Sequence, residues 1–150
     1  MVASESNPLC KTGGLADVVY SLSRELVKQG HEVFVFLPYY KKLKDKKIKT
    51  KKVSYDYVDM SWRHQYLGVF DYVVDGIKFK LIDNEQYFGR DNLYGYGDDG
   101  ERFAFFTLAV QKVIHTEKIK PDIVHVHDWQ AGMLPALMKG APLDKNKTHF

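Results

Sequence analysis

Hydrophobic and polar residues follow two different rhythms in the first forty positions. Apolar side chains recur at spacings of three and four, which predicts an amphipathic helix from residue 14 to about residue 29: Leu15, Val18, Val19, Leu22 and Leu26. Residues 33–37 are apolar without alternation, which is typical of a strand buried on both faces. Residues 1–3 are apolar and Ser4 is polar, which indicates the last residues of a buried strand. Strand, glycine-rich turn, helix and strand form a βαβ unit, so we expect a parallel sheet.

The pattern changes after residue 50. Residues 52–60 and 65–74 alternate roughly, and Asp75-Gly76 then separates them from a further β-rich run at 77–83. Asp-Gly between two such runs predicts a hairpin, hence an antiparallel excursion on the parallel sheet. Beyond it we expect a loop at 87–100, a helix from 101 to about 117, a buried strand at 123–127, a helix at 131–139 and the start of a strand at 147–150.

Composition restricts the class of protein. Of the 150 residues, 45% are hydrophobic and 27% charged, which excludes a disordered or membrane-embedded chain. No secretory signal pattern opens the sequence. Cys10 is the only cysteine, so no internal disulfide can form, and we expect a reducing, cytoplasmic compartment. We interpret residues 1–150 as one Rossmann-like α/β domain that is cut short at both ends.

Positive charge is concentrated in one segment. Residues 41–52 carry eight lysines against one acid, Asp45, within a net charge of +3. Such a run could contact nucleic acid. Nucleic-acid modules usually add arginines and stacking aromatic residues, and neither interrupts this run. The pattern therefore favours a solvated loop over a nucleic-acid partner.

The first candidate site is Lys11-Thr12-Gly13-Gly14-Leu15, between the first strand and the first helix. A helix N-terminus offers unpaired N–H groups and a partial positive charge, and glycines let a phosphate approach the backbone. Lys11 adds a full positive charge. The segment therefore suits a diphosphate or a developing negative charge. The alternative, left open by the residues alone, is a tight turn beside a solvated lysine.

The second candidate site is the stretch from His125 to Gln130. Alternation puts His125 and His127 on one face of the predicted strand, with Asp128 at its carboxyl end. Two histidines and an acid could be metal ligands, but no further ligand stands at suitable spacing. We favour His125 as a core histidine and Asp128 as a contact for sugar hydroxyls, without a metal.

The third candidate site is the loop at 92–99, which combines aromatic and acidic side chains. Aromatic rings stack on the C–H faces of sugars, and carboxylates accept from hydroxyl groups. The alternative is that Asp98 or Asp99 caps the next helix. Both roles can coexist, with Asp99 as the helix cap and Asp98 or Tyr96 facing a substrate cleft.

Five segments together resemble one known family. Residues 2–5, the Lys-Thr-Gly-Gly-Leu-Ala-Asp-Val string at 11–18, and residues 30–33, 37–40 and 127–132 are similar, in order, to the N-terminal domain of bacterial glycogen synthases and plant starch synthases. The resemblance implies a GT-B architecture, in which two Rossmann-like domains face a cleft. It implies transfer of glucose from ADP-glucose to the non-reducing end of an α-1,4-glucan, with retention of configuration and without metal or cofactor.

Carried over by position, the resemblance implies a set of substrate-binding residues. Lys11 approaches the diphosphate, Gly13 and Gly14 pack against the sugar nucleotide, and the cleft is lined by Asp17, Tyr96 and Asp128. Many bacterial members have histidine where this chain has Gln130, which puts an acid/base role there in doubt. The implied C-terminal nucleotide-binding domain is absent from these residues, so no complete catalytic set is expected and the fragment alone should be inactive.

A different class of function stays open. The chain could be a stand-alone module that binds a glucan or a sugar phosphate without catalysis. Its length favours part of an enzyme, because a two-domain glycosyltransferase needs roughly twice as many residues. This half does not distinguish ADP-glucose from UDP-glucose.

Overall fold

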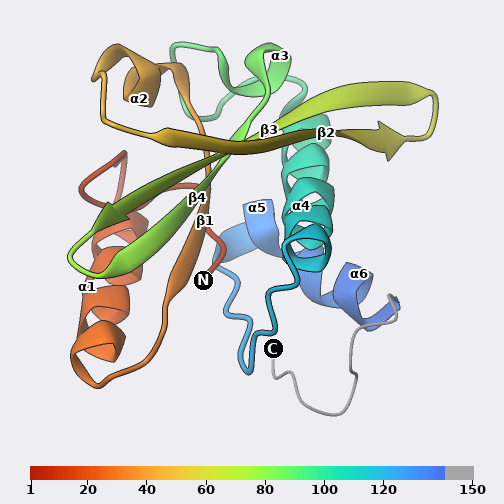
Figure 1. Ribbon diagram of the computed structural model, residues 1–150. Coiled ribbons are helices and arrows are strands. Elements are labelled where there is room, and N and C mark those ends of the chain that lie inside the picture. The colour runs from red at the N-terminus through yellow and green to blue at the C-terminus, as the bar shows by residue number, and fades with distance from the viewer. Residues whose placement is uncertain (141–150) are drawn as a thin grey trace.

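A mixed sheet forms the centre of the computed structural model, which describes residues 1–140 (Figure 1). Its strands are β1 (Phe34–Pro38), β2 (Lys51–Met60), β3 (Arg63–Val74) and β4 (Ile77–Asp83), in the order β1-β4-β3-β2. β1 and β4 are parallel, whereas β3 is antiparallel to both of its neighbours. The expected parallel core with an antiparallel excursion is therefore confirmed.

The first residues lie in the sheet as predicted. Val2 forms parallel bridges with Phe36 on one side and Val126 on the other. Its backbone N–H donates to His125 and its carbonyl accepts from His127. Since Val2 and Ala3 are almost fully buried, this short segment is a central part of the sheet.

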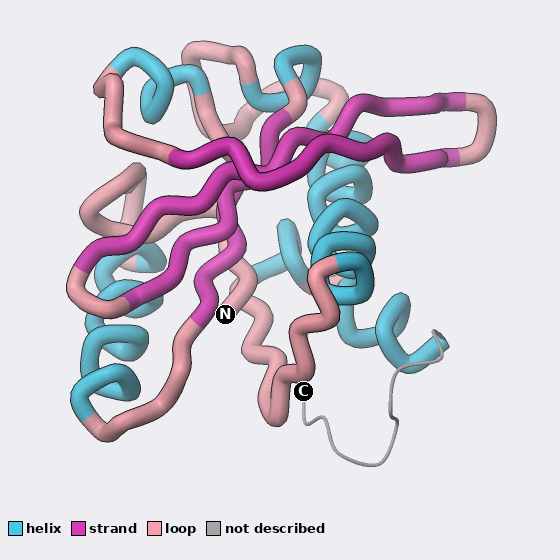
Figure 2. Tube along the Cα trace, in the orientation of Figure 1, coloured by secondary structure: helices cyan, strands magenta, loops and turns pink. Residues whose placement is uncertain are grey.

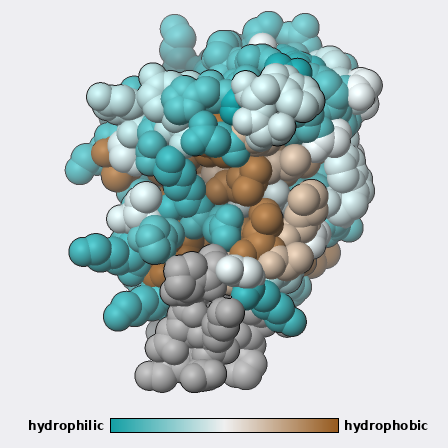
Figure 3. All heavy atoms as spheres, turned by 90° about the vertical axis from the view of Figure 1, so that its right-hand side faces the viewer, coloured by the Kyte–Doolittle hydropathy of each residue, from teal (hydrophilic) through white to brown (hydrophobic). Residues whose placement is uncertain are grey.

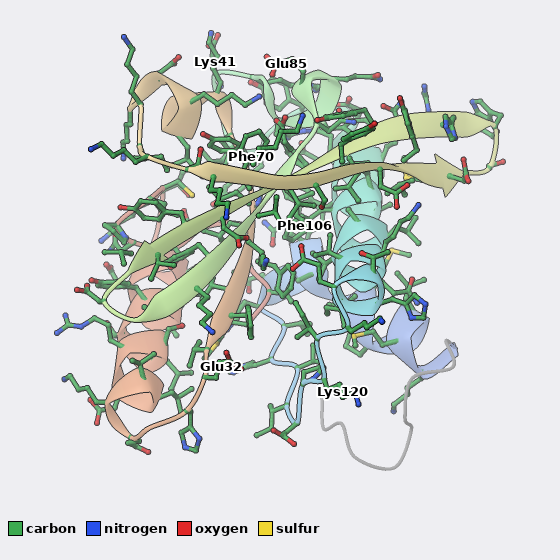
Figure 4. The ribbon with its side chains drawn as sticks, viewed as in Figure 1. Glu32, Lys41, Phe70, Glu85, Phe106 and Lys120 are labelled. Atoms are coloured by element: carbon green, nitrogen blue, oxygen red, sulfur yellow. The ribbon has the colours of Figure 1, made fainter. Side chains whose placement is uncertain are left out.

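Helices flank the sheet (Figures 1 and 2). The long ones are α1 (Leu15–Lys28) and α4 (Asp99–Thr116), close to the predicted ranges. Short ones are α2 (Lys41–Asp45), α3 (Glu85–Phe88), α5 (Asp128–Ala131) and α6 (Leu134–Gly140). Phe106 of α4 is fully buried between its helix and the sheet (Figure 4). On the face toward α4 and α6, apolar residues gather in the middle and hydrophilic ones surround them (Figure 3).

The Asp75-Gly76 hairpin is confirmed in detail. Asp75 and Gly76 have φ of 51° and 75°, the left-handed pair that a tight antiparallel hairpin requires. The Tyr20 hydroxyl of α1 donates to the Asp75 carboxylate. The turn is therefore tied to the first helix as well as to its own strands.

Three predictions about elements need correction. The lysine-rich loop contains α2, and its lysines are partly paired: Lys44 lies 2.8 Å from Asp83, and Lys41 lies 2.6 Å from Asp91. The loop expected from residue 87 begins inside α3. The single helix expected at 131–139 is interrupted at Gly132, because Pro135 has no N–H to continue the hydrogen-bond ladder.

The predicted strand at 123–127 is not continuous: Ile123 and Val126 are isolated bridge residues, and Val126 pairs with Val2. Val124 is buried, but Ile123 is 67% exposed because no element within residues 1–140 covers it. The strand expected at 147–150 lies outside the described residues.

Candidate functional site

The carboxyl ends of two adjacent strand segments bring the first two candidate sites to one rim of the sheet. The segment through Val2 ends at Glu5, and its neighbour through Val126 ends at Asp128. In open sheets of this kind, ligands bind beyond the carboxyl ends of the strands. The first two candidate sites predicted from the sequence therefore lie at the rim where this fold usually binds ligands.

The loop from Lys11 to Gly14 is exposed and leads directly into α1. Lys11 Nζ lies 2.6 Å from Asp17 Oδ2, and Asn7 Nδ2 donates to Asp17 Oδ1 at 2.5 Å. The side chains of Lys11 and Asp17 are each about half exposed, so the pair is open to a ligand. Two predicted residues thus touch each other, and their binding role stays a prediction.

The backbone donors of this loop differ from the expectation. The N–H groups of Thr12 and Gly13 already donate to the Glu5 carboxylate, at 2.5 and 3.2 Å. They are therefore not available to an anion. The N–H groups of Gly14, Leu15 and Ala16 have no acceptor within residues 1–140, and no side chain caps this end of the helix. The open donors therefore run from Gly14, the N-cap residue, into the first turn of α1.

Sequence reasoning missed Tyr94. Its hydroxyl lies 2.5 Å from Thr12 Oγ1, which joins the loop at 92–99 to the glycine-rich loop. The Tyr94 ring also packs on Phe103, which in turn contacts Trp129 at 5.3 Å between ring centroids. Tyr94 and Phe103 together therefore connect the three candidate segments. The signal in the sequence was a second tyrosine in the same loop, two positions before Tyr96.

Tyr96, the residue that was expected to line the cleft, lies between two arginines. The guanidinium carbons of Arg90 and Arg102 are 5.0 and 4.9 Å from its ring centroid, and its hydroxyl accepts from the Asn92 N–H. Within residues 1–140, no hydrogen bond joins Tyr96 to the loop at 11–14. Its ring therefore has a packing role in this structure, and a substrate contact stays a prediction.

The acids of this loop have structural partners too. Asp98 stands at the N-cap position of α4 without a cap hydrogen bond, and both its oxygens pair with Arg90 at 2.6 Å. The Arg90 guanidinium lowers the pKa of the Asp98 carboxyl below its ordinary value. Asp99 is the first helical residue and accepts from the N–H groups of Gly95 and Tyr96. Of the two acids considered as the cap, Asp98 holds the N-cap position, so the assignment of the cap to Asp99 is wrong by one position.

The two histidines lie on one face, as predicted, and their rings stack at 4.2 Å. His127 is the buried one and His125 is exposed, which reverses the expected core histidine. Burial, with a smaller effect of His125, lowers the pKa of His127 to about 4. Within residues 1–140, no group of three or more His, Cys, Asp or Glu side chains is placed to hold a metal ion.

Asp128 is exposed at the rim with a φ of 60°, a left-handed conformation that is uncommon outside glycine. Strained backbone of this kind clusters at binding sites. Trp129 beside it is 60% exposed, whereas Gln130 is buried and directed away from solvent. Of these three side chains, Asp128 and Trp129 are the ones that a ligand on the rim can reach.

A hollow of the surface lies at the opposite, amino-terminal edge of the sheet. Apolar side chains such as Leu26, Phe34 and Ile119 line most of it. Glu32 and Lys120 stand at this edge, away from α2 and α3 (Figure 4). Of the second candidate site it includes only His125, and Lys11, Gly13, Gly14, Asp17, Tyr96 and Asp128 are not part of it, so we place the functional site at the rim.

The chain is similar to known proteins along its whole length. Residues 1–150 match the family described as the starch synthase catalytic domain. Curated relatives include the glycogen synthases of Lactococcus lactis, 48% identical over 141 residues, and Clostridium kluyveri, 49% identical over 138 residues. Each alignment covers 91% of this chain but only 30% and 29% of the relative.

A solved structure agrees with these relatives. The catalytic domain of starch synthase IV from Arabidopsis thaliana, bound to ADP and acarbose, superposes with a TM-score of 0.84 and 27% identity. The match covers 96% of this chain and 31% of that one. The described residues contain no helix that is long and apolar enough to span a bilayer.

Proposed function

The chain belongs to the family of starch synthase catalytic domains, and on that premise we propose that it supplies the N-terminal wall of a glucosyltransferase cleft. The reaction is transfer of glucose from ADP-glucose to the non-reducing end of an α-1,4-glucan, with retention of configuration. Because the chain spans about 30% of the relatives' length, the other wall comes from a C-terminal domain that these 150 residues do not include.

One observation carries the proposal. Lys11 and the unpaired N–H groups at the start of α1 lie together on the carboxyl rim of the sheet. The ammonium group and the helix N-terminus both favour an anion at this point. A diphosphate leaving group gains negative charge as the glucosyl bond breaks, so these groups stabilise the transition state more than the ground state.

The Lys11 ammonium can reach the leaving group without losing its present partner. It has three N–H donors, and one of them is directed to Asp17. On this proposal the others contact the diphosphate, while Gly13 and Gly14 face the sugar nucleotide. Asp17, Tyr96 and Asp128 face the cleft. We expect the reaction to need no metal or other cofactor, and to take place in the cytoplasm.

The test is donor turnover by the complete enzyme, meaning this chain with the length that its relatives have. Purified enzyme is incubated with glycogen and either ADP-glucose or UDP-glucose, with and without EDTA, and nucleoside diphosphate release is followed. We expect release with ADP-glucose, little change with EDTA, and faster turnover than with UDP-glucose.

The same assay separates the alternatives. Residues 1–150 alone should show no turnover, because donor and acceptor must be held together by both walls. If the complete protein binds to a glycogen affinity column but releases no ADP from ADP-glucose, it is a binding module and the enzymatic proposal is wrong.

A further inference from the structure

A buried carboxylate lies beneath the glycine-rich loop. Glu5 is 1% exposed, and Ser4 and Ser6 on either side are fully buried. Within residues 1–140 Glu5 forms no ion pair with a basic side chain; its oxygens accept hydrogen bonds from the loop itself. Removing a carboxylate from water costs several kcal/mol unless charge-assisted hydrogen bonds compensate. The loop therefore provides what stabilises this charge.

Three hydrogen bonds join Glu5 to two consecutive loop residues. Glu5 Oε2 accepts from the Thr12 N–H at 2.5 Å and from Thr12 Oγ1 at 2.7 Å, and Glu5 Oε1 accepts from the Gly13 N–H at 3.2 Å. A threonine hydroxyl has one proton. Since that proton is donated to Glu5, Thr12 Oγ1 accepts from the Tyr94 hydroxyl at 2.5 Å. The network ties strand end, loop and the segment before α4 together.

We propose that Glu5 is a positioning residue that fixes the Lys11–Gly14 loop for an anionic ligand, acting through Thr12 and Gly13. The fixed pair has Lys11 directly before it and the first turn of α1 directly after it. Both groups that would meet a diphosphate are thus attached to the part of the loop that Glu5 holds. The kinetic consequence of this inference rests on the proposed function.

Glu5 also restricts where the anion can bind. It occupies the N–H groups of Thr12 and Gly13, which leaves those of residues 14–16 together with the Lys11 ammonium. Its negative charge beneath the loop repels an anion that moves deeper. The carboxylate thereby selects the position over the helix terminus.

The expected consequence is a loss of rate rather than of glucan affinity. A displacement of about 1 Å in a reacting group can lower turnover about 100-fold. Glu5→Gln keeps the shape but replaces one acceptor with an amide donor that faces an N–H group. We therefore expect kcat to fall about 10- to 100-fold, while KM for glycogen changes less than about twofold.

The experiment combines kinetics with hydrogen exchange in the complete enzyme. Glu5→Gln, Thr12→Val and their double variant are compared with the wild type, and Thr12→Ser serves as the conservative rescue. Hydrogen-exchange mass spectrometry follows the peptide that contains residues 11–16. We expect faster exchange at this peptide in Glu5→Gln and Thr12→Val, restoration by Thr12→Ser, and a double variant no slower in turnover than the worse single one.

A core variant controls for general destabilisation. Ile77→Val removes one methylene group from the fully buried first residue of β4, away from the loop. It should lower the melting temperature without changing kcat or exchange at residues 11–16.

The outcomes separate this inference from the proposed function. If Glu5→Gln keeps wild-type exchange at residues 11–16, Glu5 does not position the loop and the inference is overturned. If it exchanges faster but keeps wild-type kcat, the inferred role in catalysis is overturned. If the wild-type enzyme releases no ADP at all, the proposed function fails, and the exchange data alone decide whether Glu5 fixes the loop.

Discussion

Replacing Lys11 with alanine should separate binding chemistry from folding. The Lys11 and Asp17 side chains are 48% and 50% exposed, so their ion pair is screened by water. Exposed pairs of this kind contribute about 0.2–1 kcal/mol. We therefore expect Lys11→Ala to lower the free energy of unfolding by about 0.5 kcal/mol, too little to change the fold.

The effect on turnover should be much larger. A charged donor that faces a developing negative charge in a closed cleft contributes about 2–4 kcal/mol to the transition state. That corresponds to a loss of about 30- to 1,000-fold in kcat. Lys11→Arg should recover only part of this loss, because a planar guanidinium does not occupy the place of a compact ammonium.

The assay pairs thermal melting with steady-state kinetics in the complete enzyme, and α1 offers a matched control. Lys28 lies at the other end of the helix, where it pairs with Glu25 at 3.3 Å and is similarly exposed. Lys28→Ala should match Lys11→Ala in melting temperature but keep wild-type turnover. If Lys11→Ala melts far lower than Lys28→Ala, or keeps wild-type kcat and KM, the loop is a structural turn and the reasoning fails.

Three further predictions concern stability and charge. Arg102 is fully buried and donates to the carbonyls of Tyr87 and Leu93 and to the Asp99 carboxylate. Arg102→Met should therefore lower the free energy of unfolding in urea by about 3 kcal/mol or more. Arg24 is exposed, so Arg24→Met should lower it by less than about 0.5 kcal/mol. The pKa of His127 is about 4 in the folded protein and 6.5 for an ordinary histidine, so the unfolded chain binds the proton more readily. The free energy of unfolding should therefore fall by up to about 3 kcal/mol as the pH is lowered from 6.5 to 4. Urea unfolding at each pH should show this fall in the wild type, and His127→Gln should remove this component. Fluorescence titration at physiological salt should show only weak, non-selective binding of duplex DNA to the lysine-rich segment 41–52, and tight, sequence-selective binding would contradict it.

Elements with strong local signals were predictable from the sequence. The three-and-four spacing of α1 and the Asp75-Gly76 turn depend on residues close to one another in the chain, and both are confirmed. The predictions of a strand at 123–127 and of a single helix at 131–139 were wrong for different reasons. The first depends on which elements cover Ile123, and the second on the effect of Pro135 on a helix that reads as continuous.

The candidate site was predictable in its position and less so in its contacts. Chain order places Lys11 and Asp128 at the carboxyl ends of strands, and the fold brings these ends to one rim. The roles of Glu5 and Tyr94 require knowledge of distant packing. Glu5 accepts from residues seven and eight positions later, and Tyr94 meets Thr12 across 82 positions. For Glu5, the sequence shows only an acidic residue directly after the first predicted strand.

The position of Glu5 also accounts for a feature that the glycine motif alone leaves unexplained. A loop with two exposed glycines has high conformational entropy, and ordering it costs about 1–2 kcal/mol per residue. Charge-assisted hydrogen bonds to Thr12 and Gly13 offset that cost from beneath, where they do not obstruct the rim. The glycines then leave the outer side open to a ligand. An acid under an anion-binding loop is therefore consistent with its function, because the acid orders the backbone while Lys11 and the helix terminus supply the attraction.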